Sequence, residues 1–319
     1  MKLNDQQMLR FVERIKLPAD KQASYNNQID ALKKRVVEAI NGMPNTKISK
    51  VKRAGSWKKG TTLRPRGDMP LDVDLVFFVD VDEEVQFDSD ELRNEIITVL
   101  RKAYPDKPAE DFTSGEKTVG ITFRGTGLEV DIVPFIPDKG NSSYGRQPHK
   151  NLHSGNFRTS VDKQLTFISD IKSKWSNFSS VVRIVKWWKN RQELELPSFA
   201  VELIFAHLMG QNRVGKTISI ERALIEFFEF VSADPQIRIE FPGAIGDNLP
   251  SPDKLPIIAD PTNNKNNVMG RISLDEWNEV TGKACEAFET ISYAGSVSGD
   301  KNTTDLWREI FEGFNIQEV

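Results

Sequence analysis

Two aspartates placed one residue apart at the start of an apolar run constrain the fold of this chain more than any other feature. The run reads LDVDLVFFV over residues 71–79 and carries Asp72 and Asp74. Residues two apart on a β-strand project from the same face, about 7 Å apart along the backbone. Two like charges on one face repel each other, and each loses hydration on burial. We therefore expect a buried strand at residues 73–81, with both carboxylates at its start facing a cation.

A second apolar strand supplies a third carboxylate. Residues 127–135 read GLEVDIVPF and carry Asp131, and the short turn at residues 125–127 pairs this strand with residues 118–124 as a hairpin. Three carboxylates suit two divalent cations about 3.5 to 4 Å apart, because hard cations prefer oxygen ligands. Asp72, Asp74 and Asp131 are thus predicted to be catalytic and to hold two Mg²⁺ ions, for which Mn²⁺ can substitute.

A tight turn upstream of the two aspartates has the character of a phosphate-binding site. Gly55-Ser56 and Gly60-Thr61 bracket this turn, whose backbone N–H groups, hydroxyls and following short helix favour an anion. Gly55, Ser56 and Lys59 are therefore candidate nucleotide-binding residues. The turn is no P-loop, since GxxxxGK[ST] is absent. A Gly-Ser turn, an Asp-x-Asp strand and a later single-Asp strand are together typical of a nucleotidyltransferase palm, which joins nucleotides and releases pyrophosphate.

The remaining pattern predicts an α/β (α+β) fold with a helical second half. A long amphipathic helix is expected at residues 22–40, a strand at 48–53, and a helix at 88–103 with Ser89 as its N-cap. Residues 137–158 are polar and rich in Gly, Ser and Asn, which indicates a loop. We predict a palm domain at 1–158, with a mixed sheet and N-terminal helices, packed on a helical domain at 159–319. The active site is expected in the cleft between them.

Composition narrows the partners and the compartment. The net charge is −3, so the chain is not a polycation that would coat duplex nucleic acid. The single cysteine, Cys285, allows no intrachain disulfide, which predicts a cytoplasmic protein. Residues 1–20 are too charged for a signal peptide, and no apolar run nears the roughly 18 residues of a membrane helix, so no membrane partner is expected.

These motifs resemble the polymerase-beta-like nucleotidyltransferases, in particular the branch of oligoadenylate synthetases and CD-NTases, which are relatives of cyclic GMP-AMP synthase. RIVKWWKN at residues 183–190 resembles the synthetase helix whose lysine contacts the triphosphate, which maps to Lys186. LPSFAVEL at residues 196–203 resembles the next helix, whose aromatic residue stacks on the donor base, which maps to Phe199. ADPTNNKNNV at residues 259–268 resembles an Asp-Pro loop of the same enzymes.

The resemblance implies a bacterial CD-NTase that consumes ribonucleoside triphosphates, with ATP preferred, and makes a cyclic di- or trinucleotide second messenger in antiphage (CBASS) defence. It also implies HORMA-type or ubiquitin-transfer-like regulatory proteins as partners. Because the cysteine-histidine zinc insertion of animal cyclic GMP-AMP synthase is missing, no activation by long duplex DNA is expected. The alternatives are a linear oligoadenylate synthetase, a terminal nucleotidyltransferase, and a catalytically silent nucleotide-binding scaffold. Base identity, ring size and the choice between 2′-5′ and 3′-5′ linkage stay open at this point.

Overall fold

A computed structural model of the chain describes residues 1–42, 46–66, 69–81, 89–115, 118–148, 156–233, 235–246, 249–250 and 256–316. Contacts divide the chain into two compact units. The sheet unit is Leu17–Leu165, and the helical unit combines Met1–Lys16 with Thr166–Val319. The predicted palm domain at 1–158 placed both N-terminal helices with the sheet, whereas the first helix belongs to the helical unit.

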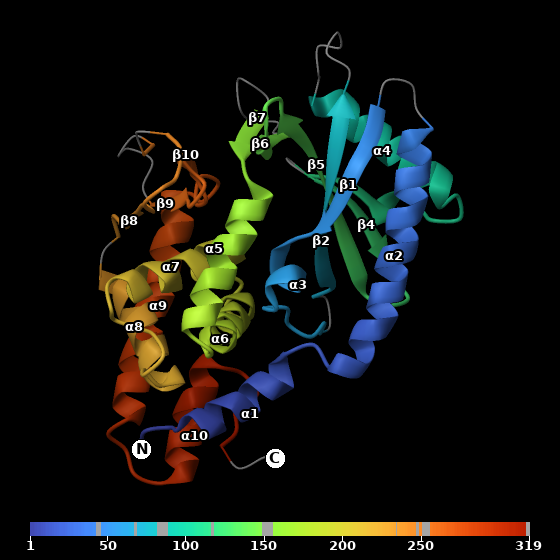
Figure 1. The fold of residues 1–319 in the computed structure, drawn as a ribbon. Coiled ribbons are helices and arrows are strands. Elements are labelled where there is room, and N and C mark those ends of the chain that lie inside the picture. The colour runs from blue at the N-terminus through green and yellow to red at the C-terminus, as the bar shows by residue number, and fades with distance from the viewer. Residues whose placement is uncertain are drawn as a thin grey trace. The chain divides into compact units, whose positions relative to one another are not determined.

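The sheet unit is built on a mixed sheet with the strand order β1-β2-β5-β4-β3 (Figure 1). β2 and β5 are parallel neighbours, while β1–β2, β4–β5 and β3–β4 pair antiparallel. β6 pairs with the end of β5, and β7 pairs with β6. The strands are β1 (Thr46–Arg53), β2 (Leu71–Val81), β3 (Phe112–Ser114), β4 (Val119–Phe123), β5 (Leu128–Asp138), β6 (Asn141–Pro148) and β7 (Asn156–Thr159); the helices are α2 (Ala19–Asn41), α3 (Gly55–Lys59) and α4 (Ser89–Ala103), with a 3₁₀ turn at Ala109–Asp111.

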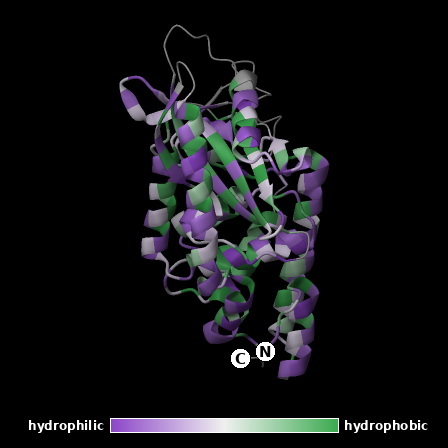
Figure 2. Cartoon of the chain, turned by 90° about the vertical axis from the view of Figure 1, so that its right-hand side faces the viewer, coloured by the Kyte–Doolittle hydropathy of each residue, from purple (hydrophilic) through white to green (hydrophobic). Residues whose placement is uncertain are grey.

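Both faces of β2 and β5 are packed, but by different cores. One face joins α2 and α4 in a large apolar cluster, to which β2 contributes Leu71, Val73, Leu75, Phe77 and Val79. The opposite face carries a smaller cluster made of Ala54, Val76, Phe78, Val133, Phe135 and Val161. Figure 2 shows the corresponding apolar colour along the strands, between helices with mixed polar and apolar faces. The nearly continuous apolar run of β2 follows from this burial on both sides.

The prediction of a loop over residues 137–158 was wrong for residues 137–138, 141–148 and 156–158, which lie in strands. β5 continues to Asp138, and β6 and β7 form a small antiparallel extension, while residues 149–155 lie outside the described part of the chain. Polar, glycine-containing strands such as NSSYGRQP pair through their main chain and carry no apolar alternation for a sequence pattern to detect. Ser89, predicted as an N-cap, is instead the first helical residue of α4, and residue 88 lies outside the described range.

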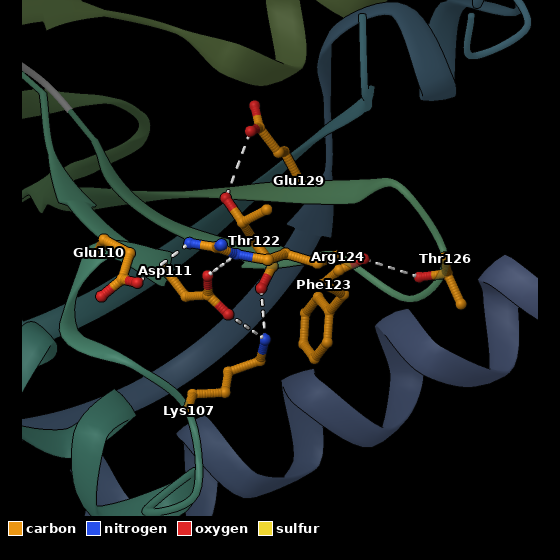
Figure 3. Close-up of polar contacts among 8 residues, drawn as sticks. All are labelled: Lys107, Glu110, Asp111, Thr122, Phe123, Arg124, Thr126 and Glu129. Carbon is orange, nitrogen blue, oxygen red and sulfur yellow. Dashed lines mark hydrogen bonds and ion pairs between the residues drawn. The ribbon is translucent and has the colours of Figure 1, made fainter. Parts of the chain in front are cut away.

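An ion cluster around the buried Asp111 side chain ties the sheet to the loop after α4 (Figure 3). The Asp111 side chain is 3% exposed and accepts hydrogen bonds from Lys107 Nζ at 2.8 Å and Arg124 Nε at 2.6 Å. Lys107 also donates to the carbonyl oxygen of Thr122 on β4 and lies 4.7 Å from the centre of the Phe123 ring. These contacts give the buried carboxylate the paired, hydrogen-bonded surroundings that a buried charge requires.

Replacing Asp111 with asparagine is expected to lower the Tm, because Lys107 and Arg124 would lose the anion between them. The hydrogen bond from Lys107, assisted by Arg124, holds the pKa of Asp111 below its ordinary value of 3.8. Stability from a lowered pKa is present above the unfolded-state value and is lost as the pH falls through the folded-state value. Thermal melts should therefore separate the variant from the wild type at pH 7 and bring them together well below pH 4. A difference in Tm that stays constant with pH would contradict this account. Glu110→Gln is the control, because Glu110 makes only an exposed contact 3.5 Å from Arg124 and its loss should change the Tm little.

The helical unit closes its core with the first helix of the chain. Phe11 of α1 contacts the rings of Trp187, Phe311 and Phe314, with centroid distances of 6.4, 6.1 and 5.4 Å. Asp5 accepts hydrogen bonds from the backbone of Ile220 and the side chain of Asn177. The elements of this unit are α1 (Asp5–Ile15), α6 (Phe178–Arg191), α7 (Ser198–Gly210), α8 (Ile220–Ala233), α9 (Leu274–Ala294), α10 (Asp300–Ile310), β8 (Arg238–Ile239), β9 (Ile257–Asp260) and β10 (Asn263–Asn267), together with most of α5 (Val161–Lys174).

None of the helices in the described ranges is both long and apolar enough to cross a membrane. The longest ones, α2 and α9, carry charged residues along their length, as their sequences show.

Candidate functional site

The register of β2 and β5 brings the predicted carboxylates to one face of the sheet. Asp74 lies directly opposite Asp131 in this parallel pair, and Asp72 lies two residues before Asp74 on the same strand. The residues between and beside them point into the α2–α4 core, so the three aspartates project from the opposite face. Asp72 is exposed, and Asp74 and Asp131 are half-buried. Neighbouring strands lie about 4.8 Å apart, which places Asp74 and Asp131 side by side.

The Gly-Ser segment forms the short helix α3 (Gly55–Lys59), where the sequence suggested a turn followed by a helix. The backbone N–H of Ala54 donates to the carbonyl oxygen of Asp74 at 2.9 Å, which fixes the start of α3 beside the carboxylates. Gly55 has a φ of +55°, and a Cβ at this position would overlap the carboxylate of Asp74. The glycine is therefore needed both for its left-handed backbone and for the close approach of Asp74.

Ser56 is held by the chain that returns after α3. Gly60 ends the helix in the left-handed conformation, and the next N–H, of Thr61, donates to the carbonyl oxygen of Ser56 at 2.9 Å. The hydroxyl of Thr62 lies 3.4 Å from the hydroxyl of Ser56. Ser56 and Lys59 are both half-buried on α3, so the structure brings Gly55 and Ser56 next to the carboxylate face and leaves Lys59 at the end of the same short helix.

Burial and the neighbouring Asp74 carboxylate raise the pKa of Asp131 from 3.8 to about 6, against a hydrogen bond involving Thr118 that lowers it. The opposite β4 residue is Gly120, and a side chain there would meet the Asp131 carboxylate at 3.2 Å. Two carboxylates that disfavour each other's ionisation are the electrostatic setting that a cation relieves.

Sequence reasoning missed a fourth acidic residue on this face, Glu129. It lies opposite Asp72 in the β2–β5 register and accepts a hydrogen bond from the Thr122 hydroxyl at 3.2 Å (Figure 3). Its charge adds to the raised pKa of Asp131. The signal was available, because Glu129 and Asp131 are two residues apart on β5 just as Asp72 and Asp74 are on β2.

Lys186 and Phe199 lie in the helical unit. Lys186, on α6, is 7% exposed, and Phe199, near the start of α7, is half-buried. The Asp-Pro segment forms the β9–β10 hairpin, where buried Asp260 accepts hydrogen bonds from Thr262 and Asn266. Asp260 is thereby engaged within its own hairpin, and the nucleotide contacts of Lys186 and Phe199 stay predictions from the resemblance.

The side chains of the carboxylate face are of the type that binds divalent metal ions. They do not converge closely enough in this structure to form a metal site. Within the described ranges, no three or more acidic, histidine or cysteine side chains come together closely enough to hold a metal ion. The donor set is all carboxylate oxygen, which Mg²⁺ and Mn²⁺ prefer. The charge repulsion between Asp74 and Asp131 is what such an ion would offset, so the residues fit the group in chemistry and in register.

Residues 1–164 match the model of a family described as the Second Messenger Oligonucleotide or Dinucleotide Synthetase domain. The chain belongs to this family, the CD-NTases. The resemblance inferred from the Gly-Ser segment and the three aspartates is thereby confirmed, and the chain is a nucleotidyltransferase.

Similar proteins cover nearly the whole CD-NTase chain. The CBASS oligonucleotide cyclase CdnC of Escherichia coli (strain KTE188) is 33% identical over 96% of this chain and 95% of its own length. The cyclic AMP-AMP-AMP synthase of Escherichia coli (strain MS 115-1) is 29% identical over 95% of this chain and 94% of its own. The CdnC of E. coli MS115-1 has been solved with ATP, with a TM-score of 0.80, 25% identity and coverage of 98% and 99% of the two chains. It has also been solved in a complex with HORMA-deltaN, with a TM-score of 0.79, 26% identity and 98% coverage of both. The predicted fold class is confirmed by this likeness.

Proposed function

We propose that this CD-NTase joins ribonucleoside triphosphates into a cyclic di- or trinucleotide that serves as a second messenger in CBASS antiphage defence. The observation that carries the proposal is the register pairing of Asp74 with Asp131 beside α3, in a chain 33% identical to an oligonucleotide cyclase along nearly its full length. ATP is the proposed preferred substrate, since one similar protein is named a cyclic AMP-AMP-AMP synthase and another was solved with ATP.

The proposed chemistry assigns one task to each group of residues. Asp72, Asp74 and Asp131 would hold two Mg²⁺ or Mn²⁺ ions, which when bound lower the pKa of the attacking hydroxyl and stabilise charge at the α-phosphorus. Ser56 would donate its hydroxyl to a phosphate oxygen of the donor triphosphate, and the N–H groups of α3 would face the same anion. Lys186 is proposed to contact the triphosphate, and Phe199 to stack on the donor base. Each phosphodiester bond forms as pyrophosphate leaves.

A HORMA-type protein is the proposed regulatory partner. The support is the solved complex of a similar CdnC with HORMA-deltaN, which covers 98% of this chain. Ubiquitin-transfer-like proteins are the second class of regulator that the family resemblance suggests. A pull-down with a purified HORMA-type protein, followed by the product assay with and without it, tests this part of the proposal.

Product analysis tests the function directly. The purified protein is incubated with all four ribonucleoside triphosphates and Mg²⁺ or Mn²⁺, treated with phosphatase, and the products are identified by mass spectrometry. Phosphatase-resistant species with cyclic di- or trinucleotide masses are expected, and they also identify the bases. Linear products that lose their terminal phosphates would overturn the cyclase proposal in favour of a linear synthetase. No product in the presence of the HORMA-type partner, with nucleotide still bound, would favour a silent scaffold.

Replacing Phe199 with alanine is expected to raise the KM for the donor nucleotide with little change in kcat. Stacking of a base on an aromatic ring contributes about 1 to 3 kcal/mol, which corresponds to roughly a five- to hundredfold effect. Initial rates over a range of ATP concentrations give the two constants. Phe167→Ala is the control, because Phe167 is also a half-buried aromatic residue of the helical unit and packs on Phe241 at 5.1 Å. Equal KM values for the two variants would mean that Phe199 only packs in the helical unit and does not stack on the donor base.

A further inference from the structure

Two lysines of β1 lie beside one carboxylate on the same face of the sheet as Asp74, and a third lysine, Lys58, lies on α3. Lys50 and Lys52 of β1 lie opposite Phe78 and Val76 of β2, and opposed residues of an antiparallel pair share a face. The ammonium groups of Lys50 and Lys52 lie 5.3 and 5.7 Å from the centre of the Phe78 ring. We call Lys50, Lys52 and Lys58 of α3 the lysine cluster. It occupies the sheet face between the Asp72–Asp74 pair and the far end of β2.

The lysine cluster has a single carboxylate partner, Asp162 at the start of α5, among the ion pairs of the described residues that involve Lys50 or Lys52. Lys52 Nζ donates to Asp162, and Lys50 Nζ lies 3.9 Å from the same carboxylate. Burial, Lys50 and Lys58 lower the pKa of Lys52 to about 8. Lys50 and Lys52 share this one carboxylate, so these two ammonium groups carry one more charge than their partner in these ion pairs.

The lysine cluster is accessible to a solute and continuous with the Ser56 helix. The side chains of Lys50 and Asp162 are 51% and 41% exposed, and that of Lys52 is 23% exposed. Lys58 lies on α3, two residues after Ser56, so the positive charge extends to the segment proposed to hold phosphate. An anion with several charges would satisfy these lysines better than Asp162 alone.

We propose that Lys52, together with Lys50, binds the polyphosphate chain of a nucleotide substrate, in competition with Asp162. The inference rests on the proposed function, because a cyclic product requires at least two nucleotides, each with its own triphosphate, beside the carboxylates. Ser56 and α3 offer a place for one of these chains, and the lysine cluster offers charge for a second phosphate group. Asp162 keeps Lys52 oriented and lowers its affinity for a competing anion.

Calorimetric titration of inorganic tripolyphosphate into the full-length protein, without metal, tests this competition. Lys52→Gln should weaken binding by roughly ten- to a hundredfold, since a charge-assisted hydrogen bond contributes about 1.5 to 3 kcal/mol. Asp162→Asn should tighten binding several-fold, because it removes the competing carboxylate. A salt bridge with a purely structural role predicts that both variants lower the Tm and leave tripolyphosphate binding unchanged, and that result would overturn the proposal.

Arg53→Gln is the matched control for the loss of one positive charge from β1. Arg53 follows Lys52 but bonds to Asn26 and Asp30 of α2, with 2.8 Å to Asp30, and so lies on the other face of the sheet. Its removal should leave tripolyphosphate binding unchanged. An equal loss in Arg53→Gln and Lys52→Gln would mean that only overall charge matters, and would also overturn the proposal.

Two nucleotide analogues distinguish the donor from the acceptor as the source of the phosphates. 2′,3′-Dideoxy-ATP can only donate, and α,β-methylene-ATP can only accept, so their mixture forms one linear dinucleotide and pyrophosphate. A higher KM for either analogue in Lys52→Gln supports the proposal and assigns the phosphates to that nucleotide. Unchanged KM values for both would overturn it, even if Asp72→Asn abolishes product as the proposed function requires. Full product formation by Asp72→Asn would instead overturn the proposed function. The metal-free titration measures only phosphate binding, so its outcome is independent of that result.

Discussion

Asp131→Asn is expected to reduce product formation by at least about a thousandfold, because a lost metal ligand removes several kcal/mol of charge stabilisation from the reacting phosphate. Asp131 stands opposite Asp74 in the β2–β5 register, so it is the β5 carboxylate placed to share a metal ion with Asp74. Asp72→Asn should have a comparable effect. Pyrophosphate release and mass spectrometry of the products measure both.

The same substitution should stabilise the metal-free fold at neutral pH. In the folded chain the pKa of Asp131 is raised from 3.8 to about 6, so its ionised form opposes folding above about pH 6, and this opposition disappears below about pH 4. A shift of about two pH units corresponds to at most about 3 kcal/mol. Denaturant unfolding at pH 7.5 should therefore find Asp131→Asn more stable than the wild type, and at pH 4 the advantage should be gone. Added Mn²⁺ should raise the Tm of the wild type alone.

Asp80→Asn controls for the loss of an acidic side chain from this strand. Asp80 lies on β2, exposed and six residues beyond Asp74, and it accepts a hydrogen bond from Ser49 at 3.2 Å. The Asp80→Asn variant should retain turnover close to that of the wild type. Near-normal product formation by Asp131→Asn, or an equal loss in Asp80→Asn, would show that the active site is not the carboxylate face described above.

Gly55→Ala is expected to cause the second-largest loss, more than about a hundredfold in product formation. The new Cβ would overlap the Asp74 carboxylate, and the left-handed backbone at φ +55° would add roughly 1 to 2 kcal/mol of strain. Displacing a catalytic group by about 1 Å can cost a hundredfold in rate. Initial rates and thermal melts should both fall, with the rate falling far more than the Tm implies.

Gly127→Ala separates the two effects in Gly55→Ala. Gly127 has a φ of +66°, and a Cβ there would meet nothing within 4 Å, so the substitution adds backbone strain without a clash. It should lower the Tm by a similar strain contribution and leave the rate unchanged at temperatures where the protein is folded. If Gly127→Ala lost as much activity as Gly55→Ala, the contact with Asp74 would not be the cause.

Local periodicity was sufficient to locate β2, β5, α2 and the aspartates, because alternation along a strand decides which side chains share a face. This rule predicts that Asp72 and Asp74 share one face of their strand. The same rule places Glu129 on the same face of β5 as Asp131, although Glu129 was missed. Ser56 and Gly55 depended on a motif, since a five-residue helix has too little periodicity to be recognised.

Features that depend on distant residues could not be predicted from these patterns. The pairing of Lys52 with Asp162 joins residues 110 positions apart, and nothing in either local sequence indicates the other. The β6–β7 extension is held by main-chain pairing, which any polar sequence can make. The grouping of α1 with the helical unit rests on contacts of Phe11 and Asp5 with residues far along the chain, which the local pattern of an amphipathic helix does not indicate.

Because α1 belongs to the helical unit, the two units can complete their cores at different times during translation. Residues 17–165 form one uninterrupted unit and can fold as soon as they have emerged. The helical unit instead completes its core when Phe11 meets Phe311 and Phe314, so one face of α1 stays uncovered until those residues have been synthesised. At translation rates of roughly 5 to 20 residues per second, α1 stays uncovered for about 15 to 60 s, an interval in which a nascent-chain chaperone would find it available.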